Sequence, residues 1–167
     1  MFGTVKSHVN YVVMDSDWEA VAAKTLDEIP EVISYVKNQF LGFAIPYVRD
    51  GAERQYFPDF IARIAVKGGE TPVNLIIEVK GYRREDAKEK RSTMETYWIP
   101  AVNNIGTFGR WAFAELTQPY TFEIDMGKQI EEAFRMMIEE VATDNSAGVR
   151  PGSAELQLGN GGKVPTY

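Results

Sequence analysis

The chain has 167 residues, of which 44% are hydrophobic and 25% are charged, values that fit a single globular domain with its own core. It contains no cysteine and one histidine. This excludes disulfides, thiolate metal sites and cysteine nucleophiles, and it argues against a histidine-built metal site. No apolar run approaches the roughly 18 residues of a membrane span, and the N-terminus lacks a signal-peptide pattern. We therefore expect a soluble, cytoplasmic protein with no membrane partner.

The net charge of −6 is unevenly distributed along the chain. Residues 80–91 hold six basic and three acidic side chains, whereas residues 115–145 hold eight acidic and two basic ones. Contacts with a phosphate backbone depend on local patches more than on total charge. The basic cluster therefore keeps nucleic acid open as a partner of an acidic protein.

The N-terminal part predicts a strand followed by a helix. Residues 4–13 are rich in β-branched and aromatic side chains, which favour a short strand. Ser16 followed three residues later by Glu19 matches the capping box that starts a helix. Apolar residues at helical spacing extend this helix to about Asn38, with a kink or a break just before Pro30.

The middle of the chain predicts strands. Residues 40–49 form a strand candidate that Pro46 places near a sheet edge or a bulge. Residues 56–80 then read as a β-hairpin, because the Gly- and Pro-rich segment 67–72 is typical of a chain reversal. The second arm, residues 73–80, is almost continuously apolar, as expected of a strand covered on both faces.

Three ionisable side chains stand out in this hairpin. Glu78 and Lys80 are two residues apart, so on a strand they point to the same face. If Val66 pairs with Val73, then Asp59 lies opposite Lys80 and shares that face. Two carboxylates and an ammonium in a buried hairpin are costly unless they are paired. A divalent metal ion together with a phosphate would pair them.

The C-terminal part predicts two more helices and one more strand. A helix is expected over residues 84–103, a strand over 110–116 and an amphipathic helix over about 126–141. Beyond them the chain is rich in Gly, Ser, Asn and Pro and has too few apolar residues to fold alone. The predicted organisation is a folded domain over residues 1–143 and a disordered tail over residues 144–167.

The predicted fold class is α/β, with an α-β-β-β-α-β order and a central mixed sheet flanked by helices. Pro58-Asp59, followed after 18 residues by Glu78-Val79-Lys80, resembles the PD-(D/E)xK nuclease signature. The short pattern occurs by chance in many proteins. Its position on two adjacent predicted strands, within the restriction-endonuclease-like element order, strengthens it.

A longer resemblance covers about residues 5–118. HVNYVVMDSDWE, VKNQFLGFAIPY, RQYFPDFIARI, LIIEVKGYRREDAKEK and WIPAVNNIGTFGRWAF together resemble the C-terminal endonuclease domain of the restriction (Res) subunit of type III restriction enzymes. Those subunits carry an ATP-dependent helicase or translocase ahead of this domain, and none is present here. The resemblance therefore implies an excised domain or a stand-alone nuclease controlled by another chain, and family-level ATP dependence is not carried over.

The resemblance implies a role for each residue of the motif. Asp59 and Glu78 would bind Mg²⁺, which prefers hard oxygen ligands, and the Val79 carbonyl would add a ligand; Mn²⁺ is a substitute. Lys80 would orient a water and neutralise charge on the phosphorane-like transition state. Glu19 has two open readings, as a further metal ligand or as the second half of the capping box. Hydrolysis would leave a 5′-phosphate and a 3′-hydroxyl.

The basic residues after the hairpin also have two readings. They could hold the DNA backbone, or they could be solvated partners of the acidic residues among them; the set is Arg83, Arg84, Lys88, Lys90 and Arg91. The resemblance implies double-stranded DNA as a partner, together with a helicase or translocase and a modification methyltransferase subunit. The alternatives are a catalytically silent nuclease-like DNA-binding or assembly module, or a repair or RNA nuclease on the same fold.

Overall fold

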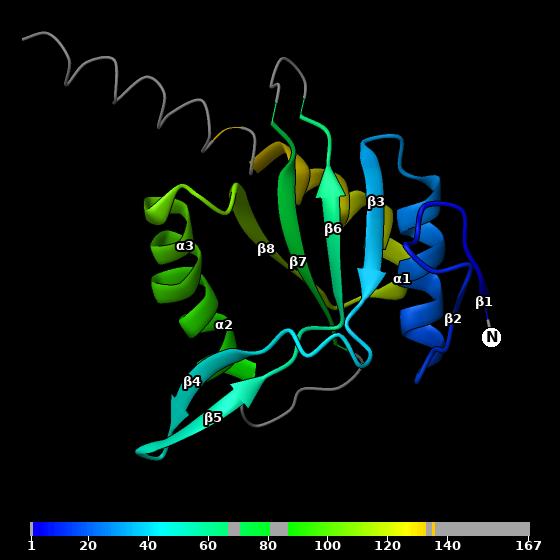
Figure 1. Cartoon of the computed structure of the whole chain (residues 1–167). Coiled ribbons are helices and arrows are strands. Elements are labelled where there is room, and N and C mark those ends of the chain that lie inside the picture. The colour runs from blue at the N-terminus through cyan, green and yellow to red at the C-terminus, as the bar shows by residue number, and fades with distance from the viewer. Residues whose placement is uncertain (1, 67–70, 81–86, 133–134, 136–167) are drawn as a thin grey trace, which may run out of the picture.

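The computed structural model describes residues 2–66, 71–80, 87–132 and 135 (Figure 1). Its centre is a four-stranded mixed sheet with the strand order β3-β6-β7-β8. The strands β3, β6 and β7 are antiparallel neighbours, and β8 runs parallel to β7. Their bounds are Val32–Lys37 for β3, Phe60–Ile64 for β6, Val73–Val79 for β7 and Arg110–Leu116 for β8.

Each face of the sheet carries its own hydrophobic cluster. On one face the strands pack against α1 (Asp17–Glu28) and the helical residues 122–132. On the other face they pack against a β-hairpin and a helical run. Leu75 belongs to the first cluster and its neighbour Ile76 to the second. Because β7 is covered on both sides, its nearly continuous apolar sequence is explained.

The first helix is shorter than predicted. Its start is confirmed, because the Ser16 side chain accepts a hydrogen bond from the Glu19 N–H, but α1 ends at Glu28. Its predicted continuation to Asn38 is wrong, since Val32–Lys37 forms β3. Pro30 stops the helix, and the β-branched segment after it pairs with β6 and buries Val32 and Tyr35 in the core.

A small hairpin interrupts the central sheet between β3 and β6. It consists of β4 (Ile45–Arg49) and β5 (Ala52–Tyr56), which pair only with each other. Asp50 (φ 53°) and Gly51 (φ 73°) form its turn, as a two-residue hairpin loop with both positions left-handed requires. The predicted strand over residues 40–49 therefore starts later than expected and lies outside the main sheet. β3 takes its place in the α-β-β-β-α-β core, whose order is confirmed.

The helical run on the same face of the sheet as the small hairpin has three parts: α2 (Ala87–Thr93), the π-helix η1 (Met94–Trp98) and α3 (Ile99–Ile105). Pro100 has no backbone N–H and so cannot donate the usual helical hydrogen bond. Just before it, the Ile99 N–H donates to the Met94 carbonyl, which is the π-helical bond of η1. The run ends at Gly106, which is left-handed (φ 75°). The helix predicted over residues 84–103 is thus confirmed over its described part.

The two ends of the domain differ in detail from the predictions. Two short strands, β1 (Phe2–Gly3) and β2 (Tyr11–Val12), replace the single strand predicted over residues 4–13. The last helix begins after the 3-10 turn η2 (Pro119–Thr121), earlier than predicted. The predicted tail over residues 144–167 lies outside the described residues. Among the helices that the structure describes, none has the length and apolarity needed to cross a membrane.

Candidate active site

The candidate site lies where β6 begins and where β7 and β8 end. Asp59 immediately precedes β6, and its Oδ2 atom accepts a hydrogen bond of 2.7 Å from the backbone N–H of Val79. Val79 is the middle residue of the Glu78-Val79-Lys80 segment. The two halves of the sequence motif are therefore brought together by a direct contact.

The hairpin register differs from the predicted one by two residues. Phe60 pairs with Ile77 and Ile64 pairs with Val73, so Asp59 comes next to Glu78 rather than opposite Lys80. The prediction assumed that β6 stays paired with β7 up to Val66. Instead β6 ends at Ile64, and the next N–H, that of Ala65, donates to the carbonyl of Glu31 at 2.7 Å. Since the error is an even number of residues, the shared face of the ionisable side chains is unchanged.

Glu78 is a largely buried acid whose pKa is strongly raised. Its Oε2 atom accepts a hydrogen bond of 2.7 Å from the hydroxyl of Tyr56, a residue that is only 2% exposed. Burial raises the pKa of Glu78 to about 7, helped by the negative charge of Asp59 and opposed by Tyr56, Lys90 and Lys80. Burial and the nearby carboxylate also raise the pKa of Tyr56, so its hydroxyl stays a donor.

Lys80 is held by a carboxylate that the sequence motif does not include. Its Nζ atom lies 2.6 Å from Oε2 of Glu115, and the side chains are only 12% and 16% exposed. Glu115 is the parallel partner of Glu78 on β8, and the Lys80 N–H donates to the carbonyl of Leu116 at 2.8 Å. Sequence reasoning missed Glu115, although an acid within the otherwise apolar strand WAFAEL was a signal.

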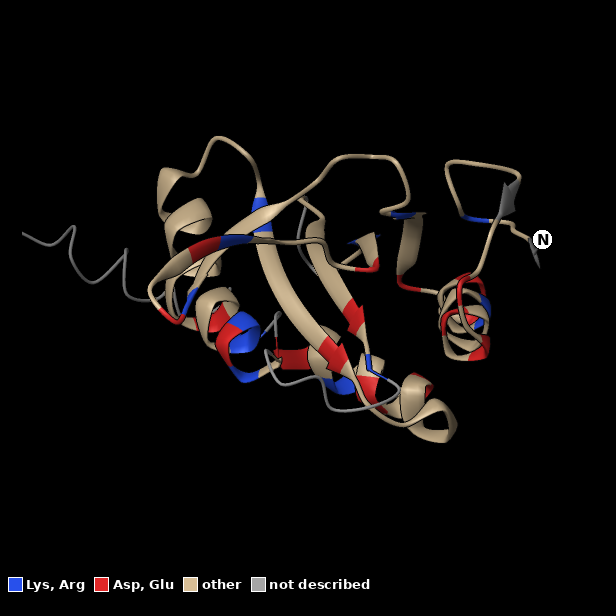
Figure 2. Cartoon of the chain, turned by 90° about the horizontal axis from the view of Figure 1, so that it is seen from below, with Lys and Arg blue, Asp and Glu red and all other residues tan. Residues whose placement is uncertain are grey.

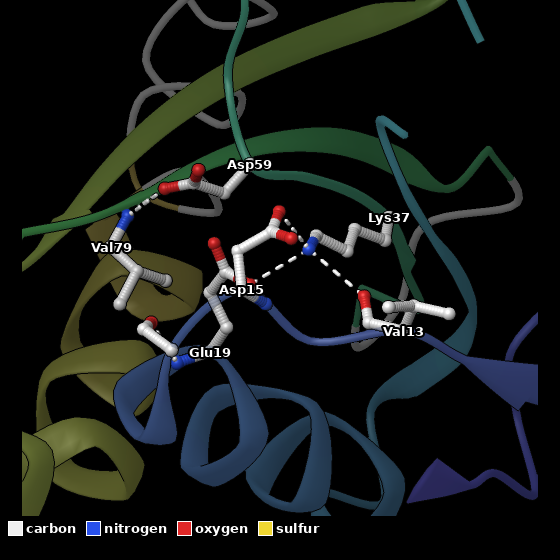
Figure 3. Close-up of polar contacts among 7 residues, drawn as sticks. Val13, Asp15, Glu19, Lys37, Asp59 and Val79 are labelled. Atoms are coloured by element: carbon white, nitrogen blue, oxygen red, sulfur yellow. Dashed lines mark hydrogen bonds and ion pairs between the residues drawn. The ribbon is translucent and has the colours of Figure 1, made fainter. Parts of the chain in front are cut away.

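Glu19 lies at the start of α1 and is 8% exposed. Its Oε2 atom accepts hydrogen bonds from the Asp15 N–H at 2.7 Å and from Lys37 Nζ at 2.8 Å. Its carboxylate thus reaches Asp15 rather than the cap residue itself. Figure 3 shows the other carboxylate oxygen of Glu19 directed to the side where Asp59 and Val79 lie. The capping contacts are therefore present, and the role of Glu19 as a metal ligand stays a prediction.

Lys37 is the buried cation of this neighbourhood, and sequence reasoning also missed it. It is 7% exposed, and its Nζ atom contacts Asp15 Oδ2 at 2.7 Å, Glu19 at 2.8 Å and the Val13 carbonyl at 3.0 Å. Burial lowers the pKa of Lys37, but the bonds to Asp15 and Glu19 outweigh it and leave the pKa above its ordinary value. Lys37 stays charged and neutralises Glu19.

The predicted DNA-binding residues have different environments. Lys90 lies over the rings of Tyr47 and Tyr56, with its Nζ atom 5.8 and 5.3 Å from the ring centroids, so it borders the Glu78 site. Lys88 is exposed, and Arg91 pairs with Glu95 at 2.8 Å on the surface. Figure 2 shows acidic positions on neighbouring strands and mixed charges on α2 beside them. The predicted contacts of Arg83 and Arg84 lie outside the described residues.

The donor chemistry of the site fits a divalent cation. Asp59 and Glu78 supply two hard carboxylates, and their mutual repulsion contributes to the raised pKa of Glu78. A bound Mg²⁺ would remove that repulsion, and Mg²⁺ sites in proteins need only one or two carboxylates because waters and phosphate oxygens complete the shell. In the described part of the chain, no group of three or more His, Asp or Glu side chains is placed to hold a metal ion. Glu115 pairs with Lys80.

The mixed sheet, the helices on both of its faces and the polar strand ends define a restriction-endonuclease-like α/β domain. A family model described as an endonuclease domain matches residues 5–105, and the chain belongs to this family. The matched range includes Asp59, Glu78 and Lys80, whereas Glu115 lies beyond it. Searches of curated proteins and of solved structures return no match. Membership assigns the chain a nuclease domain.

Proposed function

We propose that the chain is a metal-dependent DNA endonuclease domain of the PD-(D/E)xK class, acting as the cleavage module of a type III-like restriction system. One observation carries the proposal: the Asp59 carboxylate accepts the Val79 N–H at 2.7 Å. This contact places the two halves of the motif side by side, next to a Glu78 whose raised pKa shows that its charge is poorly compensated by the protein.

On this proposal Asp59, Glu78 and the Val79 carbonyl would hold Mg²⁺, with Mn²⁺ as a substitute. Glu19, which pairs with Lys37 in the structure, would have to turn toward the ion to become a further ligand. When bound there, the ion would supply a polarised water and stabilise charge on the phosphate. Tyr56 fixes the orientation of Glu78 through its 2.7 Å hydrogen bond.

Lys80 brings an ammonium to the same face of the sheet. Its contact with Glu115 fixes the side chain. The ammonium can orient the attacking water and bind a phosphate oxygen, where a compact cation is effective.

The DNA backbone would be bound by the basic residues around α2. Lys90 is placed between the small hairpin and the site through its contacts with Tyr47 and Tyr56. Lys88, Arg91, Arg83 and Arg84 would extend this contact, and each contributes to a salt-dependent affinity that carries no sequence preference. Target choice and activation would come from a modification methyltransferase subunit and from a helicase or translocase.

A plasmid cleavage assay tests the proposal. Supercoiled DNA is incubated with Mg²⁺ and the wild type, Asp59→Asn or Lys80→Ala. Lys24→Ala is the control, because Lys24 is exposed and pairs with Glu28 of its own helix. Asn keeps an oxygen for the Val79 N–H but removes the charge. We expect cleavage by the wild type and the control and none by the two site variants.

Two other outcomes would contradict the proposal. Cleavage that persists in both Asp59→Asn and Lys80→Ala would show that the site assignment is wrong. Duplex binding by the wild type without metal-dependent cleavage, also with a helicase and methyltransferase partner added, would favour the catalytically silent module.

A further inference from the structure

A seven-residue loop at the candidate site carries an unusual aromatic residue. The chain passes between the main sheet and the small hairpin twice, through residues 38–44 and through residues 57–59, because Lys37 pairs with Phe60 and Ile45 pairs with Tyr56. The longer passage therefore bulges outward. At its tip Phe40 is 99% exposed and Leu41 is 52% exposed.

Both ends of this loop are fixed. The Asn38 side chain bridges it, donating from Nδ2 to the Phe43 carbonyl at 2.7 Å and accepting the Phe43 N–H at 3.3 Å. The Phe43 ring stacks on Trp111, with centroids 5.8 Å apart and an interplanar angle of 3°, and meets Trp98 edge-on at 5.9 Å. The tip is thus presented by anchored residues on either side.

The backbone of Phe40 is in a conformation that does not suit its side chain. Its φ of 61° is left-handed, a region that glycine and asparagine tolerate and that costs other L-residues free energy. Its ring gains no burial in return, since almost all of its surface is exposed. A bulky side chain at a strained backbone position, without packing to explain it, points to a function.

The position of the loop indicates what the ring contacts. The backbone N–H of Asn38 donates to the carbonyl of Asp59 at 2.8 Å, so the loop is bonded directly to a residue of the candidate site. Phe57, in the opposing segment, is 54% exposed. Three apolar side chains supply far less than the roughly 800 Å² per partner of a stable protein interface. An aromatic ring beside a phosphodiester-cleaving site fits a nucleobase better.

We propose that Phe40 is a wedge that stacks on a base of duplex DNA next to the cleaved phosphate, with Leu41 supporting it. The proposal rests on the proposed nuclease function and adds to it how the duplex is held at the site. Stacking on an aromatic ring tolerates every base, because each has a π-face. Apolar wedges of this kind unstack a base step and kink the duplex. Such a contact suits a cleavage module whose target is chosen elsewhere.

A binding experiment tests the wedge separately from catalysis. A short duplex containing 2-aminopurine is titrated in Ca²⁺ with the wild type, Phe40→Asn, Phe40→Trp and the control Phe108→Ala. Phe108 is 64% exposed in the turn before β8, at the end of that strand away from Glu115. We expect the wild type to raise the fluorescence of the unstacked base. We expect Phe40→Asn to abolish this signal and to bind roughly five- to a hundredfold more weakly, the range for loss of one stacked base.

The remaining variants show whether stacking is the cause. Phe40→Trp should keep the affinity, and Phe108→Ala should bind like the wild type. Because Asn suits a left-handed position, the melting temperature of Phe40→Asn should equal or exceed that of the wild type, which excludes misfolding as the reason for weaker binding.

Each contrary outcome has a distinct meaning. If Phe40→Asn binds and cleaves like the wild type while Lys80→Ala is inactive, the wedge is overturned and the nuclease stands. If wild-type binding depends on Phe40 but no cleavage occurs with Mg²⁺, also with a helicase and methyltransferase partner added, the wedge stands and the nuclease fails. A wild type that does not bind DNA overturns the wedge. A change of oligomeric state in Phe40→Asn, with DNA binding unchanged, also overturns it in favour of a protein contact.

Discussion

Replacing Glu78 by Gln should stabilise the metal-free protein at pH 8 while it abolishes cleavage. The ordinary pKa of this carboxyl is 4.5, and burial together with Asp59 raises it to about 7 in the folded protein. At about 1.36 kcal/mol for each pKa unit, the difference corresponds to about 3 kcal/mol that the folded state loses when Glu78 ionises. Gln keeps an oxygen for the Tyr56 hydroxyl and carries no charge.

The sign of the pH dependence follows from the raised pKa. Between pH 4.5 and about 7 the folded protein holds a proton on Glu78 that the unfolded chain has released, so stability falls as the pH rises through this window. Above pH 7 the loss is complete, and below pH 4.5 it is absent. The advantage of Glu78→Gln should therefore appear from pH 4.5 upward and level off above pH 7.

Urea unfolding of wild type and Glu78→Gln across this pH range, in EDTA, measures the difference directly. Glu53→Gln serves as the control, because Glu53 lies exposed on β5. Adding Mg²⁺ at pH 8 should stabilise the wild type and leave Glu78→Gln unchanged, since ligand binding to the folded state stabilises it. A Glu78→Gln variant that is no more stable than the wild type at pH 8 would refute the argument that the ionised Glu78 destabilises the folded protein.

Three further predictions concern the surroundings of the site. Lys37→Met should destabilise the fold by about 3 to 5 kcal/mol in urea unfolding, because it leaves the Glu19 carboxylate buried without its cation; a smaller loss would mean that water reaches Glu19. Phe40→Asn should stabilise the fold by about 1 kcal/mol through relief of the left-handed strain, and a lower melting temperature would contradict this. Lys90→Ala should raise the pKa of Glu78, because the Lys90 charge lowers it; the midpoint of the pH–rate profile should move upward, and an unchanged midpoint would separate Lys90 from the site.

Local sequence signals predicted the parts of the fold that depend on neighbouring residues. The Ser16 cap located the start of α1, and the apolar run of β7 identified a strand covered on both faces. The apolar spacing of Val32–Lys37 fits a period of 3.6 as well as of 2, so the local sequence predicts a helix there. Only its pairing with β6 decides between the two, and that contact lies outside any local window.

The same reason explains which site residues the sequence missed. Asp59 and Glu78 follow from a linear motif, and a single hairpin brings them together. Glu115 reaches Lys80 only through the parallel pairing of β7 with β8. In the sequence these two strands are separated by a long crossover through α2, η1 and α3. Lys37 reaches Glu19 only because β3 lies beside α1 (Figure 1). Contacts between parallel strands that are joined by a crossover leave no pattern of residue spacing in the sequence, and only the structure reveals them.

Two features of the candidate site, the ionised Glu78 and the left-handed Phe40, each destabilise the folded state. Ionising Glu78 is unfavourable because of burial and Asp59. Holding Phe40 left-handed is sterically unfavourable, and its exposed ring gains no packing that would offset this cost. Asn38 connects them, since its N–H bonds to the Asp59 carbonyl and its side chain fixes the loop. A metal ion would relieve the first cost, and stacking on a base would offset the second. If the metal ion and the DNA bind to the same protein molecule, the binding of each should favour the binding of the other. DNA affinity of the wild type should then rise with Ca²⁺, and that rise should be lost in Asp59→Asn.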